Sequence, residues 1–168
     1  MRFKRDRGDP HRRLGGCTLS ERSGTRRVVG KTYIACAIAN KDCRLKFAVR
    51  YFRTGSLLSA IALGRADGSY PRLARSLGKT NLLVLDDWGL YPLDAQSARE
   101  IFEILEDRSG TGSTMIVSQI PVSSWFDGIA APTIADAILD RLVHGSYRIE
   151  MQGESMRKKL SELTKEER

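Results

Sequence analysis

The sequence holds few of the residues from which disulfide frameworks and zinc sites are built. Its 168 residues include two histidines and three cysteines, with no Cys-x-x-Cys pair, which argues against both kinds of site. No apolar run approaches the roughly 18 residues of a membrane span, and the arginine-rich start lacks the hydrophobic segment of a signal peptide. We therefore expect a soluble protein of the reducing cytoplasm without a membrane partner.

Acidic residues are scarce at the amino end of the chain. Residues 1–31 carry ten Lys and Arg against three Asp and Glu, so most of the net charge of +8 is concentrated there. Residues 1–28 also lack the apolar period of a helix or a strand and are rich in Arg, Gly and Ser. We expect a basic segment without regular structure, which would bind nucleic acids weakly through their phosphates.

Glycines are also missing where a phosphate-binding loop requires them. The tripeptide G-K-T at 30–32 matches the end of the P-loop pattern G-x-x-x-x-G-K-[ST]. Five positions before Gly30 stands Thr25, while Gly24 lies one position too early, and residues 26–29 are Arg-Arg-Val-Val. The glycine backbone that would curl around phosphates is therefore incomplete.

Nucleotide chemistry needs a lysine, a hydroxyl and acidic residues. The sequence offers Lys31, Thr32 and a pair of acidic residues downstream. Lys31 would neutralise phosphate charge, and the Thr32 hydroxyl would bind Mg²⁺ at the start of a helix. The apolar run "NLLVLDDWG" at 81–89 ends in Asp86, placed to hold Mg²⁺, and Asp87, placed to polarise an attacking water. An ordinary helix start and a solvated turn are the alternative interpretations of the two motifs.

Strand and helix patterns alternate along the rest of the chain. The pattern predicts strands over 45–52, 81–89, 113–121 and 146–152 and helices over 31–39, 54–66, 94–108 and 132–144, with a short helix before residue 81. Alternation of this kind is typical of an α/β fold with a mostly parallel sheet covered on both faces. A chain of this length suits one compact domain.

Two further polar positions are candidates for the same site. Ser118 and Gln119 end a predicted strand, where a polar side chain could touch a terminal phosphate or its water. Arg141 lies near the end of a predicted helix and could act as an arginine finger in the site of a neighbouring subunit. A surface salt bridge is the ordinary alternative for such an arginine.

Four segments in the same order resemble the IstB-like transposition helper ATPases, relatives of the DnaC helicase loaders within the AAA+ ATPases. These segments, which together cover about Gly30 to Lys159, are "GKTYIACAIAN", "LLVLDDWGLYPL", "STMIVSQIPVSSWFD" and "PTIADAILDRLVHGSYRIEMQGESMRKK". The resemblance implies a P-loop NTPase fold of the AAA+ type with a three-layer parallel sheet. It further implies ATP and Mg²⁺ as cofactors, ATP hydrolysis, DNA and a transposase as partners, and a homo-oligomer.

The resemblance also implies residue roles. It places Gly30, Lys31 and Thr32 on the Walker A motif, Asp86 and Asp87 on Walker B, Gln119 on the sensor-one position and Arg141 on the candidate finger. Thr32 and Asp86 would then hold the metal, and Asp87, Gln119 and Arg141 would serve catalysis.

The amino end departs from the family pattern, in which a helical DNA-binding region and an apolar strand precede a full glycine-rich loop. Residues 1–29 match none of this, so we expect the strand before the P-loop to be degraded or missing. The sequence then divides into a basic segment 1–29, an ATPase core 30–160 and a charged tail 161–168. The abrupt change at Gly30 suggests a frameshift or misplaced start in a degraded insertion-sequence gene.

The incomplete loop leaves the activity of this chain open. Nucleotide affinity should be poor and hydrolysis slower still, because the loop positions the phosphates. A non-catalytic module that binds nucleic acids through its basic segment is the main alternative. A small P-loop kinase is disfavoured, because no lid with clustered arginines is evident.

Overall fold

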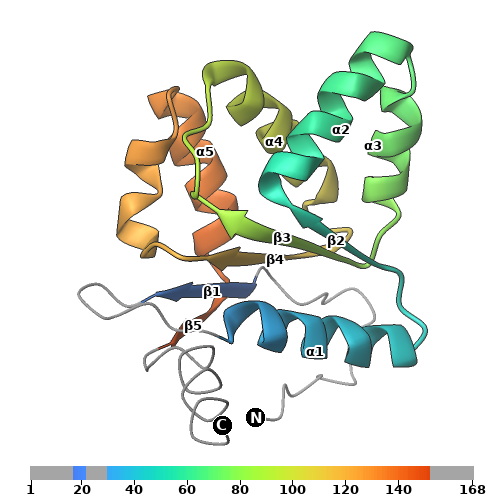
Figure 1. The fold of residues 1–168 in the computed structure, drawn as a ribbon, viewed down its shortest axis with the longest axis vertical. Coiled ribbons are helices and arrows are strands. Elements are labelled where there is room, and N and C mark those ends of the chain that lie inside the picture. The colour runs from blue at the N-terminus through green and yellow to red at the C-terminus, as the bar shows by residue number, and fades with distance from the viewer. Residues whose placement is uncertain (1–16, 22–29, 152–168) are drawn as a thin grey trace, which may run out of the picture.

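The computed structural model describes residues 17–21 and 30–151, which form one five-stranded, all-parallel sheet with helices on both faces (Figure 1). The elements in chain order are β1 (Cys17–Glu21), α1 (Lys31–Arg44), β2 (Val49–Arg53), α2 (Thr54–Asp67), α3 (Tyr70–Gly78), β3 (Leu82–Trp88), α4 (Ala95–Arg108), β4 (Ser113–Ser118), the 3₁₀ turns η1 (Val122–Ser124) and η2 (Phe126–Gly128), α5 (Pro132–Val143) and β5 (Tyr147–Met151). The strand order is β2-β3-β4-β1-β5. The predicted α/β fold class is confirmed.

The third strand, β3, shows why the sheet is covered on both faces. Its side chains alternate, so that Leu82 and Val84 pack with the α1 side of the molecule, while Leu83 and Leu85 pack with α2 to α5. Figure 1 shows α1 on one side of the sheet and α2 to α5 on the opposite side. A strand buried on both faces has a nearly continuous apolar sequence, which is how residues 82–85 read.

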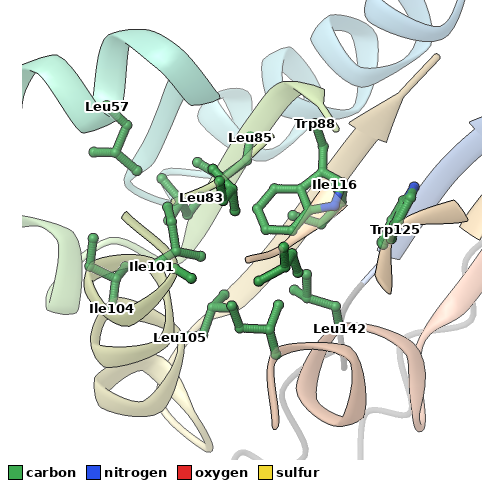
Figure 2. Close-up of a cluster of buried hydrophobic side chains, with 14 of the residues drawn as sticks. Leu57, Leu83, Leu85, Trp88, Ile101, Ile104, Leu105, Ile116, Trp125 and Leu142 are labelled. Carbon is green, nitrogen blue, oxygen red and sulfur yellow. The ribbon is translucent and has the colours of Figure 1, made fainter. Parts of the chain in front are cut away.

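Two tryptophans anchor the larger core, on the side of α2 to α5 (Figure 2). Trp88 ends β3 and Trp125 lies between η1 and η2, and both are at most 2% exposed, with ring centroids 5.8 Å apart. The indole Nε1 of Trp125 donates a hydrogen bond to Ser118 Oγ at 3.2 Å. The loop after β4 is thereby fixed against the end of β3, next to the carboxyl edge of the sheet.

One expectation about the fold is wrong, because the strand thought to be degraded or missing is present as β1. It lies between β4 and β5, and Thr18, Leu19 and Ser20 are at most 2% exposed. A central strand covered on both faces needs no alternation of polar and apolar residues, so this strand of five residues, with the sequence CTLSE, escaped the pattern. The rest of the segment 1–29, and the tail 161–168, lie outside the described residues.

The predicted helices and strands otherwise have their counterparts, with shifted ends. The second strand begins at Val49 and not at Leu45, because residues 45–48 turn back from the end of α1. In that turn the Phe47 amide donates to Asp42 O at 3.1 Å, and Lys46 has a φ of 65°. Among the helices of the described residues, none is long and apolar enough to cross a membrane.

Candidate nucleotide site

The carboxyl ends of the strands and the start of α1 meet at one edge of the sheet. Because all five strands are parallel, their carboxyl ends share that edge. β1 and β4 are neighbours, and the helix that follows β1 covers one face of the sheet while the helix that follows β4 covers the other, so the two connections diverge there (Figure 1). In open α/β sheets, ligands bind in the crevice that such a divergence opens.

Helix α1 begins at this edge without an acidic residue in its first turn. Its N-cap is Gly30, whose φ of 129° is a conformation that glycine adopts without strain and other residues do not. Lys31 follows as the first helical residue and is 5% exposed. The helix therefore presents its positive end toward the edge.

Thr32 and Asp86 are in direct contact although 54 residues separate them in the chain. The Thr32 hydroxyl donates to Asp86 Oδ2 at 2.8 Å. Asp86 is only 4% exposed, and its other oxygen, Oδ1, accepts from the backbone N–H of Asp87 at 2.8 Å. The predicted metal pair is thus a hydroxyl and a buried carboxylate whose oxygens lie side by side.

Asp87 is turned toward the same edge by an irregularity in β3. The register between β3 and β4 shifts between Leu85 and Trp88, and Asp87 has a φ of 57°. A non-glycine residue in this region costs about 1 kcal/mol and is most frequent at functional sites. Its carboxylate accepts from Gln119 Nε2 at 3.2 Å and lies 3.6 Å from Arg53 Nε.

Two of the candidate positions lie apart from this cluster. Ser118 is fully buried, and its hydroxyl donates to Trp88 O at 2.8 Å, so its role is in the core. Arg141 pairs with Glu106 of α4 and lies with its guanidinium 5.0 Å from the centre of the Phe102 ring. Within this chain Arg141 therefore forms a salt bridge, which was the alternative to an arginine finger. A role in the site of a neighbouring subunit stays a prediction.

Sequence reasoning missed two side chains that β2 brings to the site, Tyr51 and Arg53. The Tyr51 hydroxyl donates to Asp86 Oδ2 at 2.5 Å, and Arg53 is the partner of Asp87 described above. Burial, and then the hydrogen bond to Asp86, raise the pKa of Tyr51, so the hydroxyl keeps its proton at neutral pH. The available signal was the two-residue spacing of a strand, which puts both residues on one face of the sheet.

The residues present suit a magnesium ion that is carried by a nucleotide. A hydroxyl and a carboxylate are the hard oxygen donors that Mg²⁺ prefers, and Thr32 and Asp86 offer one each. Within residues 17–21 and 30–151 no group of three or more His, Cys, Asp or Glu could hold a metal ion by itself. Mg²⁺ usually takes one or two protein ligands and completes its shell with phosphates and water.

Comparison with protein families gives one match over most of the chain. The family described as IstB-like ATP binding protein matches residues 24–164. The insertion sequence ATP-binding protein y4pL of Sinorhizobium fredii (strain NBRC 101917 / NGR234) is 54% identical over 130 residues, which are 77% of this chain and 53% of that protein. The chain spans little more than half the length of such curated relatives.

Solved structures of similar fold include DnaI and the replication initiator DnaA. DnaI superposes with a TM-score of 0.70 at 20% identity, covering 84% of this chain and 76% of that one. The replication initiator DnaA, bound to AMPPCP and single-stranded DNA, superposes with a TM-score of 0.66 at 18% identity, covering 93% and 46% of the two chains. At these identities the likeness establishes the AAA+ fold alone.

The family match corrects one expectation about the amino end. It begins at residue 24, six residues before Gly30, whereas residues 1–29 were expected to match nothing in the family. Those six residues include the Arg-Arg-Val-Val stretch that stands where small residues are usual in a P-loop. The family sequence therefore extends through the unusual loop and does not start after it.

Proposed function

The chain belongs to the family of IstB-like ATP-binding proteins, and on that basis we propose that it binds ATP with Mg²⁺ at the carboxyl edge of its sheet. The observation that carries the proposal is the contact between Thr32 at the start of α1 and Asp86 at the end of β3. A hydroxyl at a helix start beside a buried carboxylate is the pair that Mg²⁺-nucleotide sites of P-loop proteins use.

Each residue near the phosphates has a role that follows from its chemistry. Gly30 and the N–H groups of the first turn of α1 receive the phosphate oxygens, and the helix end favours their negative charge. The Lys31 ammonium neutralises the β- and γ-phosphates, while Thr32 and Asp86 hold the metal. When bound, Mg²⁺ would neutralise charge that develops on the phosphate oxygens.

Asp87 and Gln119 form the catalytic part of the proposed site. Their hydrogen bond holds a carboxylate and an amide next to each other, and the attacking water would lie beside both groups. Asp87 would accept the hydrogen bond of that water and Gln119 would fix its direction, while Arg141 would act on the site of a neighbouring copy. Hydrolysis by this chain should be slow, because its loop lacks the glycines that position the phosphates.

The wider function that we propose is ATP-dependent help in DNA transposition. Matched relatives are named as ATP-binding proteins of insertion sequences, and a structural neighbour, DnaA, binds single-stranded DNA. We accordingly propose DNA and a transposase as partners, with several copies of the chain assembling so that Arg141 of one copy reaches the nucleotide of the next.

A second candidate function is favoured by the charge of the amino end. Ten Lys and Arg within residues 1–31 would neutralise phosphates of DNA or RNA without any nucleotide in the site. In that case the fold would serve as a non-catalytic module that binds nucleic acids, with an affinity that falls steeply as salt is added.

Nucleotide-dependent stabilisation separates the two functions. At 100 times its dissociation constant, Mg-ATP should stabilise the folded chain by about 2.7 kcal/mol, which raises the melting temperature by roughly 5–10 °C. Lys31→Ala should remove that gain, whereas Lys79→Ala, a matched change just after α3, should keep it. The absence of any shift in the wild-type chain at millimolar Mg-ATP would favour the non-catalytic module.

A further inference from the structure

Tyr51 reaches the candidate metal site from the edge strand of the sheet. In the register of β2 against β3, Tyr51 lies opposite Val84 and Arg53 lies opposite Asp86. Val84 belongs to the core on the α1 side. Tyr51 is its register partner on β2 and Asp86 lies two residues further along β3, so both face that side as well. The strand pairing itself therefore directs the tyrosine toward the carboxylate.

Both carboxylate oxygens of Asp86 accept hydrogen bonds. Oδ2 accepts from the hydroxyls of Thr32, at 2.8 Å, and Tyr51, at 2.5 Å, while Oδ1 accepts from the Asp87 amide. The backbone carbonyl of Asp86 in addition accepts from the Thr54 hydroxyl at 3.0 Å. Main chain and side chain are thus both fixed, and Tyr51 contributes to this from outside the P-loop and Walker B motifs.

The donors in these hydrogen bonds are neutral groups, which matters for a cation site. A lysine or arginine in place of Tyr51 would also hold the carboxylate, but its charge would repel a divalent ion only a few ångströms away. A phenol orients the carboxylate and leaves its negative charge available to the metal. Partners that orient a metal-binding group in this way are commonly worth 10- to 100-fold in metal affinity.

Resting on the proposed function, we propose that Tyr51 is a positioning residue of the nucleotide site, whose hydroxyl holds Asp86 in the orientation from which Asp86 and Thr32 bind the Mg²⁺ of the nucleotide. The competing explanation is that the hydroxyl only satisfies a buried carboxylate. The two explanations differ in whether the loss of the hydroxyl changes the dependence of nucleotide binding on Mg²⁺.

The test is a calorimetric titration. Mg²⁺ is added to the full chain, which is saturated with the non-hydrolysable analogue AMPPCP, and the heat of binding gives the Mg²⁺ midpoint. Tyr51→Phe removes the hydroxyl and keeps the ring, which is 40% exposed on an edge strand, so the variant should fold. Tyr70→Phe is the matched control, since the Tyr70 ring lies on α3 and stacks with Arg65, away from the site.

We expect the Mg²⁺ midpoint of Tyr51→Phe to rise about tenfold, with binding of AMPPCP in EDTA within twofold of wild type. Tyr70→Phe should behave as wild type in both measurements. An unchanged Mg²⁺ midpoint in Tyr51→Phe, with or without a lower melting temperature, would overturn the positioning role and leave the proposed function intact. If the wild-type chain itself binds no AMPPCP with Mg²⁺, the proposed function fails and the role of Tyr51 fails with it.

Discussion

Replacing Arg108 with methionine is expected to lower the free energy of unfolding by about 3–5 kcal/mol, because buried carbonyl groups that lose a hydrogen-bond donor cost roughly 1–3 kcal/mol each. Arg108 ends α4 and is 1% exposed, and its guanidinium donates to Thr80 O at 3.0 Å, to Ser113 O at 2.6 Å and to Leu77 O. The side chain thereby joins the end of α3 to the start of β4. Methionine fills much of the same volume but removes the guanidinium hydrogen bonds to these three carbonyl oxygens, of which Leu77 O also accepts from the Thr80 amide at 3.1 Å.

Urea denaturation of the two proteins at pH 7 measures this loss. Burial lowers the pKa of Arg108 to about 10, so the guanidinium still carries its charge at that pH. Arg99→Met, an exposed position on the same helix, is the matched control and should change stability by no more than about 0.5 kcal/mol. Equal midpoints for Arg108→Met and wild type would show that the network around Arg108 does not hold α3, α4 and β4 together.

Deleting the single residue Arg27 is expected to raise ATP turnover from background by roughly 100-fold, the effect that correct placement of reacting groups commonly has. The deletion brings Gly24 to five positions before Gly30, so that the sequence reads G-T-R-V-V-G-K-T and fits the P-loop pattern. The backbone N–H groups of a loop of regular length can then surround the β- and γ-phosphates while Asp87 and Gln119 act on the water.

Steady-state phosphate release under Mg-ATP measures that turnover. Arg27→Ala is the control, because it removes the same charge without changing the length of the loop, and it should stay at background. An equal gain in Arg27→Ala would assign the defect to charge and not to spacing. Robust turnover by the unaltered chain that is lost in Asp87→Asn would show that the present loop is sufficient.

The sequence predicts best those parts of the fold where a single physical requirement, such as burial on both faces of the sheet, decides the choice of residues. Burial on both faces leaves few choices for residues 82–85, so β3 and the acids that follow it could be recognised from the apolar run alone. Thr32 and Asp86 could be paired in advance for a related reason. A helix start and a strand end that each carry an oxygen ligand have to meet at the carboxyl edge of a parallel sheet.

The parts that sequence missed depend on contacts between distant segments. β1 is a strand because β4 and β5 flank it, and its five residues carry no period of their own. The positive φ of Asp87 arises from the register shift beside it, which pairing with β4 decides. Tyr51 and Arg53 read as ordinary strand residues until their register against β3 places them beside two carboxylates.

The most direct test of the central claim is isothermal titration of ATP into wild type, Thr32→Val, Asp86→Asn and the double variant, with Mg²⁺ and in EDTA. If these residues hold one metal ion together, each single change should weaken binding in Mg²⁺ by at least about tenfold, and the double variant should be little weaker than either. In EDTA all four proteins should bind ATP alike. Equal affinities of the four proteins in Mg²⁺, or losses of the same size in EDTA, would contradict a magnesium nucleotide site at Thr32 and Asp86.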